Sequence, residues 1–321
     1  MRFSSVSTWL LVPVLLLGST HEVAAKDINF GWPSGEGWSS QPYKVAVERG
    51  FFEREGLKVR MITFRGTNLM LAALMSGDLD YMTILPFTVG AAARGVPVKI
   101  VGSVTKSATV AIISRPEVDS IKSLRGKKIG INSFGSSVDY TVYAALSRSG
   151  LDPYKDVNIL MAGGGNIDRI ASVLSGSIDA TVVSSPFEYQ AEKQGLKTLV
   201  SARELGELVR IPVTGIGLTN KKIEKDPDEI VRLLRALKAA IQVLQEQQSY
   251  SIGLFEKSMR IDRPMAEKLY GLVREQYNPE LTLPDGVVND LLAVGNFRSK
   301  EKNTFNVQAV RDWSFAEKAK K

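Results

Sequence analysis

The side chains of this sequence that could do chemistry stand in six loops, and each loop follows an expected β-strand. They are hydroxylic, amide, aromatic or charged, and one glycine accompanies them: Trp38, Ser39, Arg65, Gly66, Thr67, Phe87, Ser136, Ser137, Asn166, Phe187 and Glu188. Hydroxyls, amides and free backbone N–H groups hold a polar molecule through hydrogen bonds, and aromatic rings stack on a flat one. These residue types therefore predict a non-covalent site for a small polar or aromatic molecule.

Three of the hydroxyls stand where helices are expected to begin. Thr67 precedes one helix, and Ser136 and Ser137 precede another that starts near Val138. Backbone N–H groups at a helix N-terminus can receive an anion, whereas a Ser or Thr in that position also caps its own helix. Either role is open for each residue alone. The ligand role gains weight if all three residues face one cleft.

The aromatic and charged candidates also have two possible roles each. Trp38 and Phe187 could close over a flat or apolar ligand, or they could pack between structural units. Glu188 would oppose an anion, but it could accept hydrogen bonds from an amine or an amino-substituted ring, or stabilise the first turn of its own helix. Arg65 could pair with a carboxylate or sulfonate ligand or with a surface acid. Charge therefore does not identify the ligand.

The composition excludes several catalytic and metal chemistries. The chain has no cysteine, and its single histidine, His21, lies in a segment that we expect to be removed. Ser-His-Asp catalysis, cysteine nucleophiles, thiolate metal sites and histidine-ligated zinc or iron then lack their residues. We expect no catalytic residues, no metal ligands and no cofactor.

A pattern that occurs twice positions these loops. Residues 66–95 and 164–195 each read as a glycine-bearing loop, a helix, a Ser-Gly stop, a short apolar strand and a Pro-Phe loop that opens another helix. Asn68, Asp80 and Phe87 of the first copy match Asn166, Asp179 and Phe187 of the second. A duplicated βαβαβ unit predicts two similar lobes with mainly parallel sheets, although two α/β domains could have acquired the same turns independently. Ligands of such sheets bind beyond the carboxyl ends of the strands.

The remaining strands divide the chain between the two lobes. Residues 109–114 and 213–219 read as strands that cross from one lobe to the other. The first lobe would comprise residues 26–107 and 215–321, and the second residues 108–214. Helix starts at residues 226–227, 263–264, 284–285 and 307–308 predict C-terminal helices that pack on the first lobe. A chain of 321 residues with 44% hydrophobic and 23% charged residues can supply a core for each lobe.

Residues 1–25 read as a secretory signal peptide. Arg2 provides a basic start, residues 9–17 an apolar run, and Val23, Ala24 and Ala25 the small residues of a cleavage site. The run is shorter than the roughly 20 residues that span a bilayer. We therefore expect cleavage between Ala25 and Lys26 and export of a soluble protein.

The charge pattern argues against nucleic acid as a partner. The net charge of +7 is scattered, and aromatic residues are not interleaved with the basic clusters. A solvated basic face is the simplest explanation, with a mild attraction for anionic solutes as the alternative. Nothing in the sequence indicates oligomerisation, so we expect a monomer.

Several short sequence segments, taken in order, resemble those of a known family. They are YKVAVERGFFEREGLKV (residues 43–59), MLAALMSGDLD (70–80), IKSLRGKKIG (121–130), SSVDY (136–140), SGSIDA (175–180) and Pro186-Phe187. Together they are similar to the nitrate/sulfonate/taurine and thiamine-pyrimidine branch of the periplasmic solute-binding proteins of ABC transporters. The resemblance covers about residues 27–219, and the C-terminal helices match only in kind.

The resemblance implies a two-lobed, type II-like periplasmic binding protein whose sheets are flanked by helices and joined by two crossover segments. It implies a periplasmic receptor that captures a small organic solute, such as a sulfonate, an aromatic or carboxylate anion or a pyrimidine-like molecule, between the lobes. Its partner would be an ABC permease in the inner membrane with its ATPase. One alternative is a pyrimidine-synthase-like enzyme, whose iron chemistry needs histidine and cysteine that the mature chain lacks. Another is a ligand sensor for a membrane signalling partner.

Overall fold

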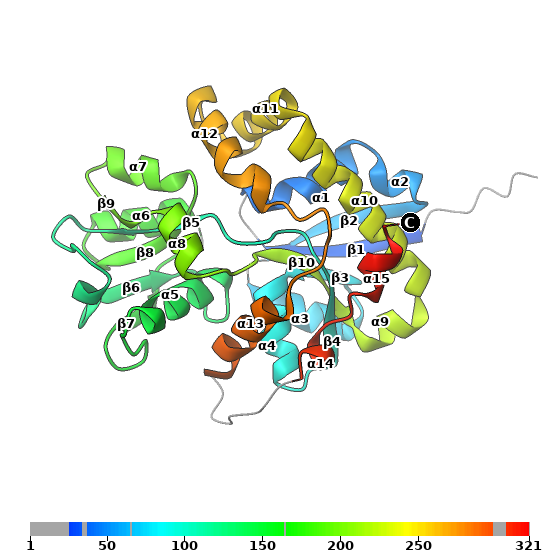
Figure 1. The fold of residues 1–321 in the computed structure, drawn as a ribbon, viewed down its shortest axis with the longest axis horizontal. Helices are drawn as coiled ribbons and strands as arrows, with labels where there is room; N and C mark the ends of the chain where they lie inside the picture. Colours follow the sequence, from blue (N-terminus) through cyan, green and yellow to red (C-terminus); the bar gives the residue numbers. More distant parts are fainter. Residues whose placement is uncertain (1–25, 34–36, 65, 164, 298–305, 321) are drawn as a thin grey trace, which may run out of the picture.

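The protein has two lobes, seen side by side in Figure 1. The structure is a computed structural model that describes residues 26–33, 37–64, 66–163, 165–297 and 306–320. The expected signal peptide, residues 1–25, and the candidate ligand residue Arg65 lie outside the described residues. Within the described part, no helix has the length and apolar character needed to cross a membrane.

The first lobe is built on a five-stranded sheet with the order β2-β1-β3-β10-β4. Its strands are β1 (Lys26–Pro33), β2 (Leu57–Phe64), β3 (Tyr81–Ile84), β4 (Val98–Ser103) and β10 (Thr214–Thr219). β1 runs parallel to β2 and β3, and β10 runs antiparallel to β3 and β4.

The second lobe repeats this arrangement with the order β7-β6-β8-β5-β9. Its strands are β5 (Val110–Ser114), β6 (Lys128–Ile131), β7 (Asn158–Met161), β8 (Ala180–Ser184) and β9 (Lys197–Val200). β6 runs parallel to β7 and β8, and β5 runs antiparallel to β8 and β9. In each sheet the antiparallel strand is the one that arrives from the other lobe, so the expected pair of similar, mainly parallel lobes is confirmed.

Helices cover both faces of the two sheets. In the first lobe they are α1 (Gln41–Glu48), α2 (Phe51–Arg54), α3 (Thr67–Ser76) and α4 (Leu85–Ala93), and in the second α5 (Ser137–Arg148), α6 (Asn166–Leu174), α7 (Phe187–Lys193) and α8 (Ala202–Leu208). Among the described residues after β10, further α-helices follow: α9 (Asn220–Lys225), α10 (Pro227–Glu246), α11 (Gln248–Met259), α12 (Arg263–Val273), α13 (Asp285–Phe297), α14 (Val307–Val310) and α15 (Ser314–Lys318).

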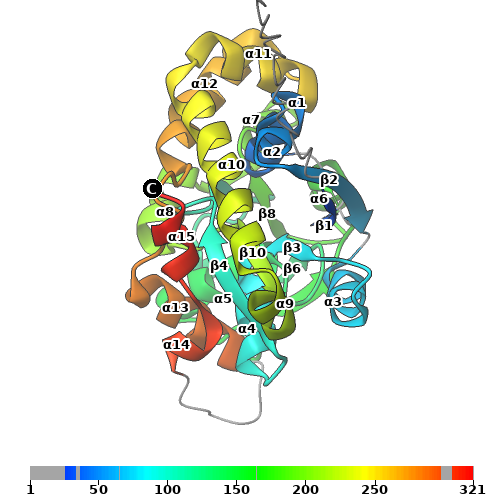
Figure 2. The same ribbon diagram turned by 90° about the vertical axis from the view of Figure 1, so that its right-hand side faces the viewer.

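Helix α10 carries the apolar stripe that the sequence indicates. Ile230, Leu233, Leu237, Ile241 and Leu244 recur at helical spacing and are all fully buried in the core of the first lobe. Pro227 stands in the first turn, where a missing N–H group leaves no helical hydrogen bond unmade. Figure 2 looks onto this long helix, which packs on α1 and α2.

Helix α13 is one of the C-terminal helices expected to pack on the first lobe, and it packs on the second lobe as well. It contacts α4 of the first lobe and α5 of the second. Val288 and Leu291 share one apolar cluster with Val89 of α4 and Tyr140 of α5. This helix therefore links the lobes through packed side chains beside the crossovers.

The two crossovers lie next to each other and are joined by backbone hydrogen bonds. The N–H of Ala108 donates to the carbonyl of Ile211 at 2.7 Å, and the N–H of Val104 donates to that of Thr214 at 3.0 Å. A third segment, which connects α12 to α13, runs alongside, and its Gln276 carbonyl accepts from the N–H of Lys106 at 2.7 Å. The covalent connection between the lobes is thus narrow, because it consists of extended segments that lie side by side.

Candidate functional site

A small cavity lies between the lobes, and both lobes and both crossovers contribute to its wall. Its lining residues are Gly37, Trp38, Ser39, Ala108, Val110, Ser137, Val138, Thr141, Ser184 and Val213. Three predicted candidates, Trp38, Ser39 and Ser137, are among them. The cavity measures about 40 Å³, enough for water but far below the roughly 150 Å³ that takes up a benzene molecule.

Trp38 forms a fixed wall of this cavity rather than a movable cover. Its side chain is 2% exposed, and its ring meets the edge of the Tyr277 ring with centroids 5.5 Å apart. The Tyr277 hydroxyl donates to the Trp38 carbonyl at 2.9 Å. The neighbouring Ser39 carbonyl accepts from the Thr214 hydroxyl at 3.3 Å. The core of the first lobe thus holds this side of the cleft in place.

Ser136 and Ser137 differ in what they contact. Ser136 is the N-cap of α5: its hydroxyl accepts from the N–H of Asp139 at 3.2 Å and also bonds to the Asn132 side chain. Ser137 is the first residue of α5 and lines the cavity. The capping role therefore applies to Ser136, and the cleft position to Ser137.

Thr67 is not the N-cap of its helix, contrary to the expectation from sequence. Gly66 holds that position with φ 142° and makes no side-chain cap, and α3 begins at Thr67 itself. A positive φ of this kind suits glycine, which has no Cβ, so the threonine falls into the first turn, where it is buried. Neither Gly66 nor Thr67 lines the cavity.

Phe87 lies where the lobes touch. It is buried in a cluster with Met70 and Leu74, and its ring sits against Gly135 of the second lobe, where an added Cβ would come within 3.2 Å of it. One turn further along α4, Gly90 similarly leaves room for the Tyr140 hydroxyl of α5. The two helices are therefore in contact beside the cleft.

Asn166 supports the second lobe from inside. Its side-chain oxygen accepts from the N–H of Ser184 at 3.0 Å and from Nη2 of Arg169 at 2.9 Å. Because Ser184 lines the cavity, Asn166 positions a wall residue without being part of the wall.

Phe187 and Glu188 begin α7 in the second lobe. Phe187 is half-buried and packs against the cores of both lobes. Glu188 is 3% exposed; its Oε1 accepts from the Ser185 hydroxyl at 2.8 Å, and its Oε2 has no hydrogen-bond partner among the described residues. Burial raises the pKa of Glu188, and hydrogen bonds from its own backbone and from Ser185 offset only part of the effect. This carboxyl therefore holds its proton more strongly than an exposed glutamate.

Residues 39–250, well over half of the chain, match the family described as NMT1/THI5 like. The chain belongs to the NMT1/THI5-like family. A relative from Bacillus subtilis (strain 168), named for aliphatic sulfonate binding, is 27% identical over 296 residues, which cover 88% of this chain and 85% of that protein. A 4-amino-5-hydroxymethyl-2-methylpyrimidine phosphate synthase from Schizosaccharomyces pombe is 23% identical over 260 residues, covering 75% and 71%.

Solved structures show the same fold. The periplasmic nitrate-binding protein NrtA from Synechocystis PCC 6803 superposes with a TM-score of 0.74 at 14% identity, over 93% of this chain and 88% of that one. The two-lobed architecture of this NMT1/THI5-like chain is therefore that of periplasmic binding proteins.

Arg169 and Lys268 were not predicted from sequence. Arg169 is buried in the second lobe, where Nε and Nη2 donate to the Val182 carbonyl at 3.2 and 3.1 Å. Burial lowers the pKa of Arg169 to about 10, and Asp168 opposes the change. The ammonium of Lys268 lies 3.6 Å from the centre of the Tyr189 ring across the lobes. The spacing of Arg169 three residues after Asn166 could have drawn attention to it in the sequence. No local sequence pattern marks the contact between Lys268 and Tyr189.

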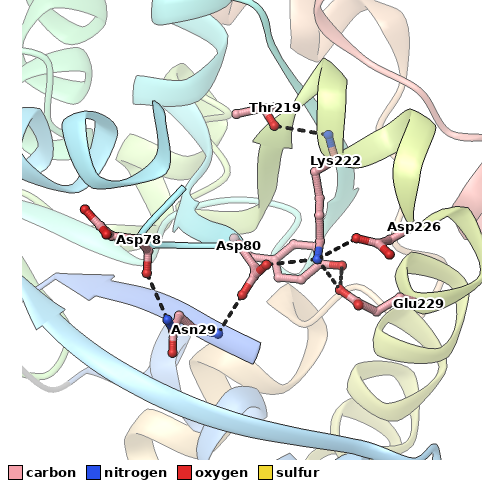
Figure 3. A network of polar contacts seen from close by, with 8 residues as sticks. Asn29, Asp78, Asp80, Thr219, Lys222, Asp226 and Glu229 are labelled. Atoms are coloured by element: carbon pink, nitrogen blue, oxygen red, sulfur yellow. Dashed lines mark hydrogen bonds and ion pairs between the residues drawn. The ribbon is translucent and has the colours of Figure 1, made fainter. Parts of the chain in front are cut away.

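A dense ion-pair network lies at the opposite end of β3 from the cleft (Figure 3). Nζ of Lys222 contacts Asp80 at 2.9 Å, Asp226 at 3.0 Å and Glu229 at 2.8 Å. Burial opposes the charge of Lys222, but hydrogen bonds to Glu229, Asp80 and Asp226 more than offset it and raise its pKa. These ion pairs join the start of β3 to α9 and α10, so the network is structural. In the described residues, this network included, no group of three His, Cys, Asp or Glu side chains is placed to hold a metal ion.

Proposed function

We propose that this chain is the extracytoplasmic receptor of an ABC importer and that it captures a small organic solute between its lobes. One observation carries the proposal: the cavity is walled by residues of both lobes and both crossovers, including Trp38, Ser137 and Val213. A change in the angle between the lobes would therefore open or close it. Hinge closure of two domains around a ligand is the usual mechanism of such receptors.

The small size of the cavity supports a receptor whose lobes must open before a solute can enter. At about 40 Å³ it is too small for an organic solute, because pockets for such ligands measure about 300–1,000 Å³. The described arrangement thus represents lobes that have closed together, with contacts such as Phe87 against Gly135 between them. Rotation about the narrow crossovers would create the volume that a solute needs.

The chemistry of the wall favours an anionic or flat polar solute. The hydroxyl-bearing residues Ser137, Thr141 and Ser184 line the cavity, and α5 begins there at Ser137, where backbone N–H groups attract negative charge. The Trp38 ring offers an apolar surface on the other side. We therefore propose sulfonates, aromatic or carboxylate anions and pyrimidine-like molecules as the solute classes.

An enzyme of the pyrimidine-synthase type is the second candidate, because one relative carries that name. We propose binding without catalysis instead. The chain has no cysteine, and its single histidine precedes the expected cleavage site, so the residues that such iron chemistry needs are missing from the mature protein.

The remaining assignments follow from the receptor proposal. We propose a periplasmic monomer that is exported by the segment 1–25 and delivers its solute to an inner-membrane permease driven by a separate ATPase. A sensor for a membrane signalling partner would use the same cleft. Reconstituted transport with the permease would distinguish the two roles, since a pure sensor supports no uptake.

A ligand screen tests the proposal. The protein is unfolded and refolded to remove any solute, and its thermal stability is measured with sulfonates, aromatic acids, nitrate and pyrimidines. A ligand at 100 times its Kd stabilises the folded state by about 2.7 kcal/mol, so a true solute should raise the Tm by several degrees. Small-angle scattering should then show compaction. A ligand that binds tightly without changing the radius of gyration contradicts capture by lobe closure.

A further inference from the structure

A second and larger cavity lies outside the cleft, between α5, α13 and residues 209–211 of the crossover that leads from α8 back to β10. It measures about 180 Å³. Tyr143 and Ala144 of α5 face Val209 and Ile211 of the crossover, and Ala293 of α13 completes the wall. None of its lining residues lines the cleft cavity. An apolar cavity of about 150 Å³ accommodates benzene, so this one has room for a six-membered carbon ring.

Two guanidinium groups and one carboxylate stand at this cavity. Arg148 is already engaged, because Nη1 donates to the Leu208 carbonyl at 2.8 Å and Nη2 to Asp290 at 3.2 Å. Arg210 is exposed and forms no ion pair with any residue that the structure describes. The local charge is therefore positive, with one guanidinium available beside an apolar space.

We propose that this cavity binds a small monoanion with an apolar body of about six carbons, such as an aromatic carboxylate. The ring would lie among Tyr143, Ala144 and Val209, and the carboxylate would pair with Arg210. A planar guanidinium binds a carboxylate through two parallel hydrogen bonds. Such a ligand complements both the apolar wall and the unpaired charge, whereas a bare inorganic anion would leave the wall uncovered.

The site is independent of the proposed solute cleft. Its wall combines α5 of the second lobe with α13, which packs on α4 of the first. Ile211 in the same wall accepts the hydrogen bond from Ala108 that joins the two crossovers. The ligand would therefore bind at the hinge side of the molecule, where it can be detected whether or not the cleft is occupied.

Alanine methyl groups provide a local readout. In protein labelled with ¹³C at the alanine methyls, benzoate should shift the signals of Ala144 and Ala293 saturably and leave Ala46, buried in the first lobe, unchanged. Benzamide has the same shape without the charge and should bind more weakly. Arg210→Gln should weaken benzoate binding about two- to fivefold, the range of an exposed ion pair. Ala293→Leu, at the exposed rim, should weaken it further by filling the entrance.

Several results would overturn the proposal. These are the absence of a saturable shift at Ala144, equal binding of benzamide and benzoate, and unchanged benzoate affinity in both Arg210→Gln and Ala293→Leu. A shift at Ala108, which lines the cleft, without one at Ala144 would place benzoate in the cleft and also contradict the second site. Because Ala144 and Ala108 report separately, failure of this proposal is distinguishable from failure of the receptor proposal.

Discussion

Lys268 of α12 and Tyr189 of α7 form a cation–π contact, with 3.6 Å between the ammonium nitrogen and the ring centre. The two helices belong to opposite lobes and lie on either side of the gap at the top of Figure 1. Phe187, two residues before Tyr189, packs against the cores of both lobes. Since an exposed cation–π contact contributes about 0.5–1 kcal/mol, this pair holds the lobes together at the edge remote from α13.

Removing the ring should shift the lobes toward an open arrangement. In Tyr189→Leu we expect the ratio of closed to open molecules to fall about two- to fivefold, the equivalent of about 0.5–1 kcal/mol. The chain has no native cysteine, so spin labels at Lys193→Cys and Lys257→Cys can report the distance between α7 and α11. Tyr189→Phe keeps an aromatic face and serves as the matched control. An identical distance distribution in Tyr189→Leu and the unsubstituted protein would show that the contact does not hold the lobes.

Alanine substitutions at Ser136 and at Ser137 should have different effects, the first on the free energy of unfolding and the second on solute affinity. Ser136→Ala removes the N-cap of α5 and should lower the free energy of unfolding by about 1 kcal/mol. Ser137→Ala removes a hydroxyl from the cleft wall and should weaken solute binding about fivefold or more, because an unpaired buried group costs about 1–3 kcal/mol. Calorimetry and denaturant unfolding measure both quantities. If Ser137→Ala changes only stability, it is not a ligand residue.

Trp38→Ala should be severely destabilising. The ring is 2% exposed and packs on Tyr277, and truncating a buried tryptophan costs about 3–5 kcal/mol. Trp38→Phe keeps an aromatic ring in the core and should lose much less stability. A near-unchanged unfolding free energy in Trp38→Ala would contradict the core role of this residue.

The repeated pattern in the sequence predicted much of the fold because it encodes local contacts. Asp80 and Asp179 make the same hydrogen bond in the two lobes: each side chain accepts from a backbone N–H of the neighbouring parallel strand, Asn29 at 2.9 Å and Lys128 at 2.8 Å. The strand registers also agree, since Phe30 pairs with Tyr81 and Ile129 pairs with Ala180. Short-range spacing of this kind can be recognised without coordinates.

The site was predicted less completely because its geometry depends on distant segments. Trp38 is a fixed core residue since Tyr277, remote in the sequence, packs on it. Thr67 does not cap α3, because Gly66 takes the N-cap position with a positive φ. Residue types alone do not reveal that backbone conformation. Tertiary packing thus decided which of several chemically suitable residues reached the cleft.

Lys222→Met should destabilise the first lobe. Lys222 is 11% exposed and compensates three carboxylates, and removal of one partner from a buried ion pair costs about 3–5 kcal/mol. We expect a loss near the lower end, about 3 kcal/mol, since two of the three acids retain partial access to water. Lys221→Met is the matched control at an exposed neighbouring position. Equal unfolding midpoints for the two variants in urea would rule out a stabilising network.

Glu188 should make stability fall as the pH rises above the ordinary glutamate pKa of 4.5. Burial raises its pKa in the folded protein, so the folded state binds the proton more tightly than the unfolded chain. Stability is therefore greatest below pH 4.5 for this group and is lost as the pH rises through the raised pKa, by at most about 1.4 kcal/mol per pH unit. Glu188→Gln is neutral at every pH and should remove that slope. Glu192→Gln, at an exposed position on the same helix, removes only a secondary cause of the shift and should retain most of the slope. Urea unfolding from pH 4 to 8 measures the difference, and parallel profiles for Glu188→Gln and the unsubstituted protein would mean that Glu188 titrates normally.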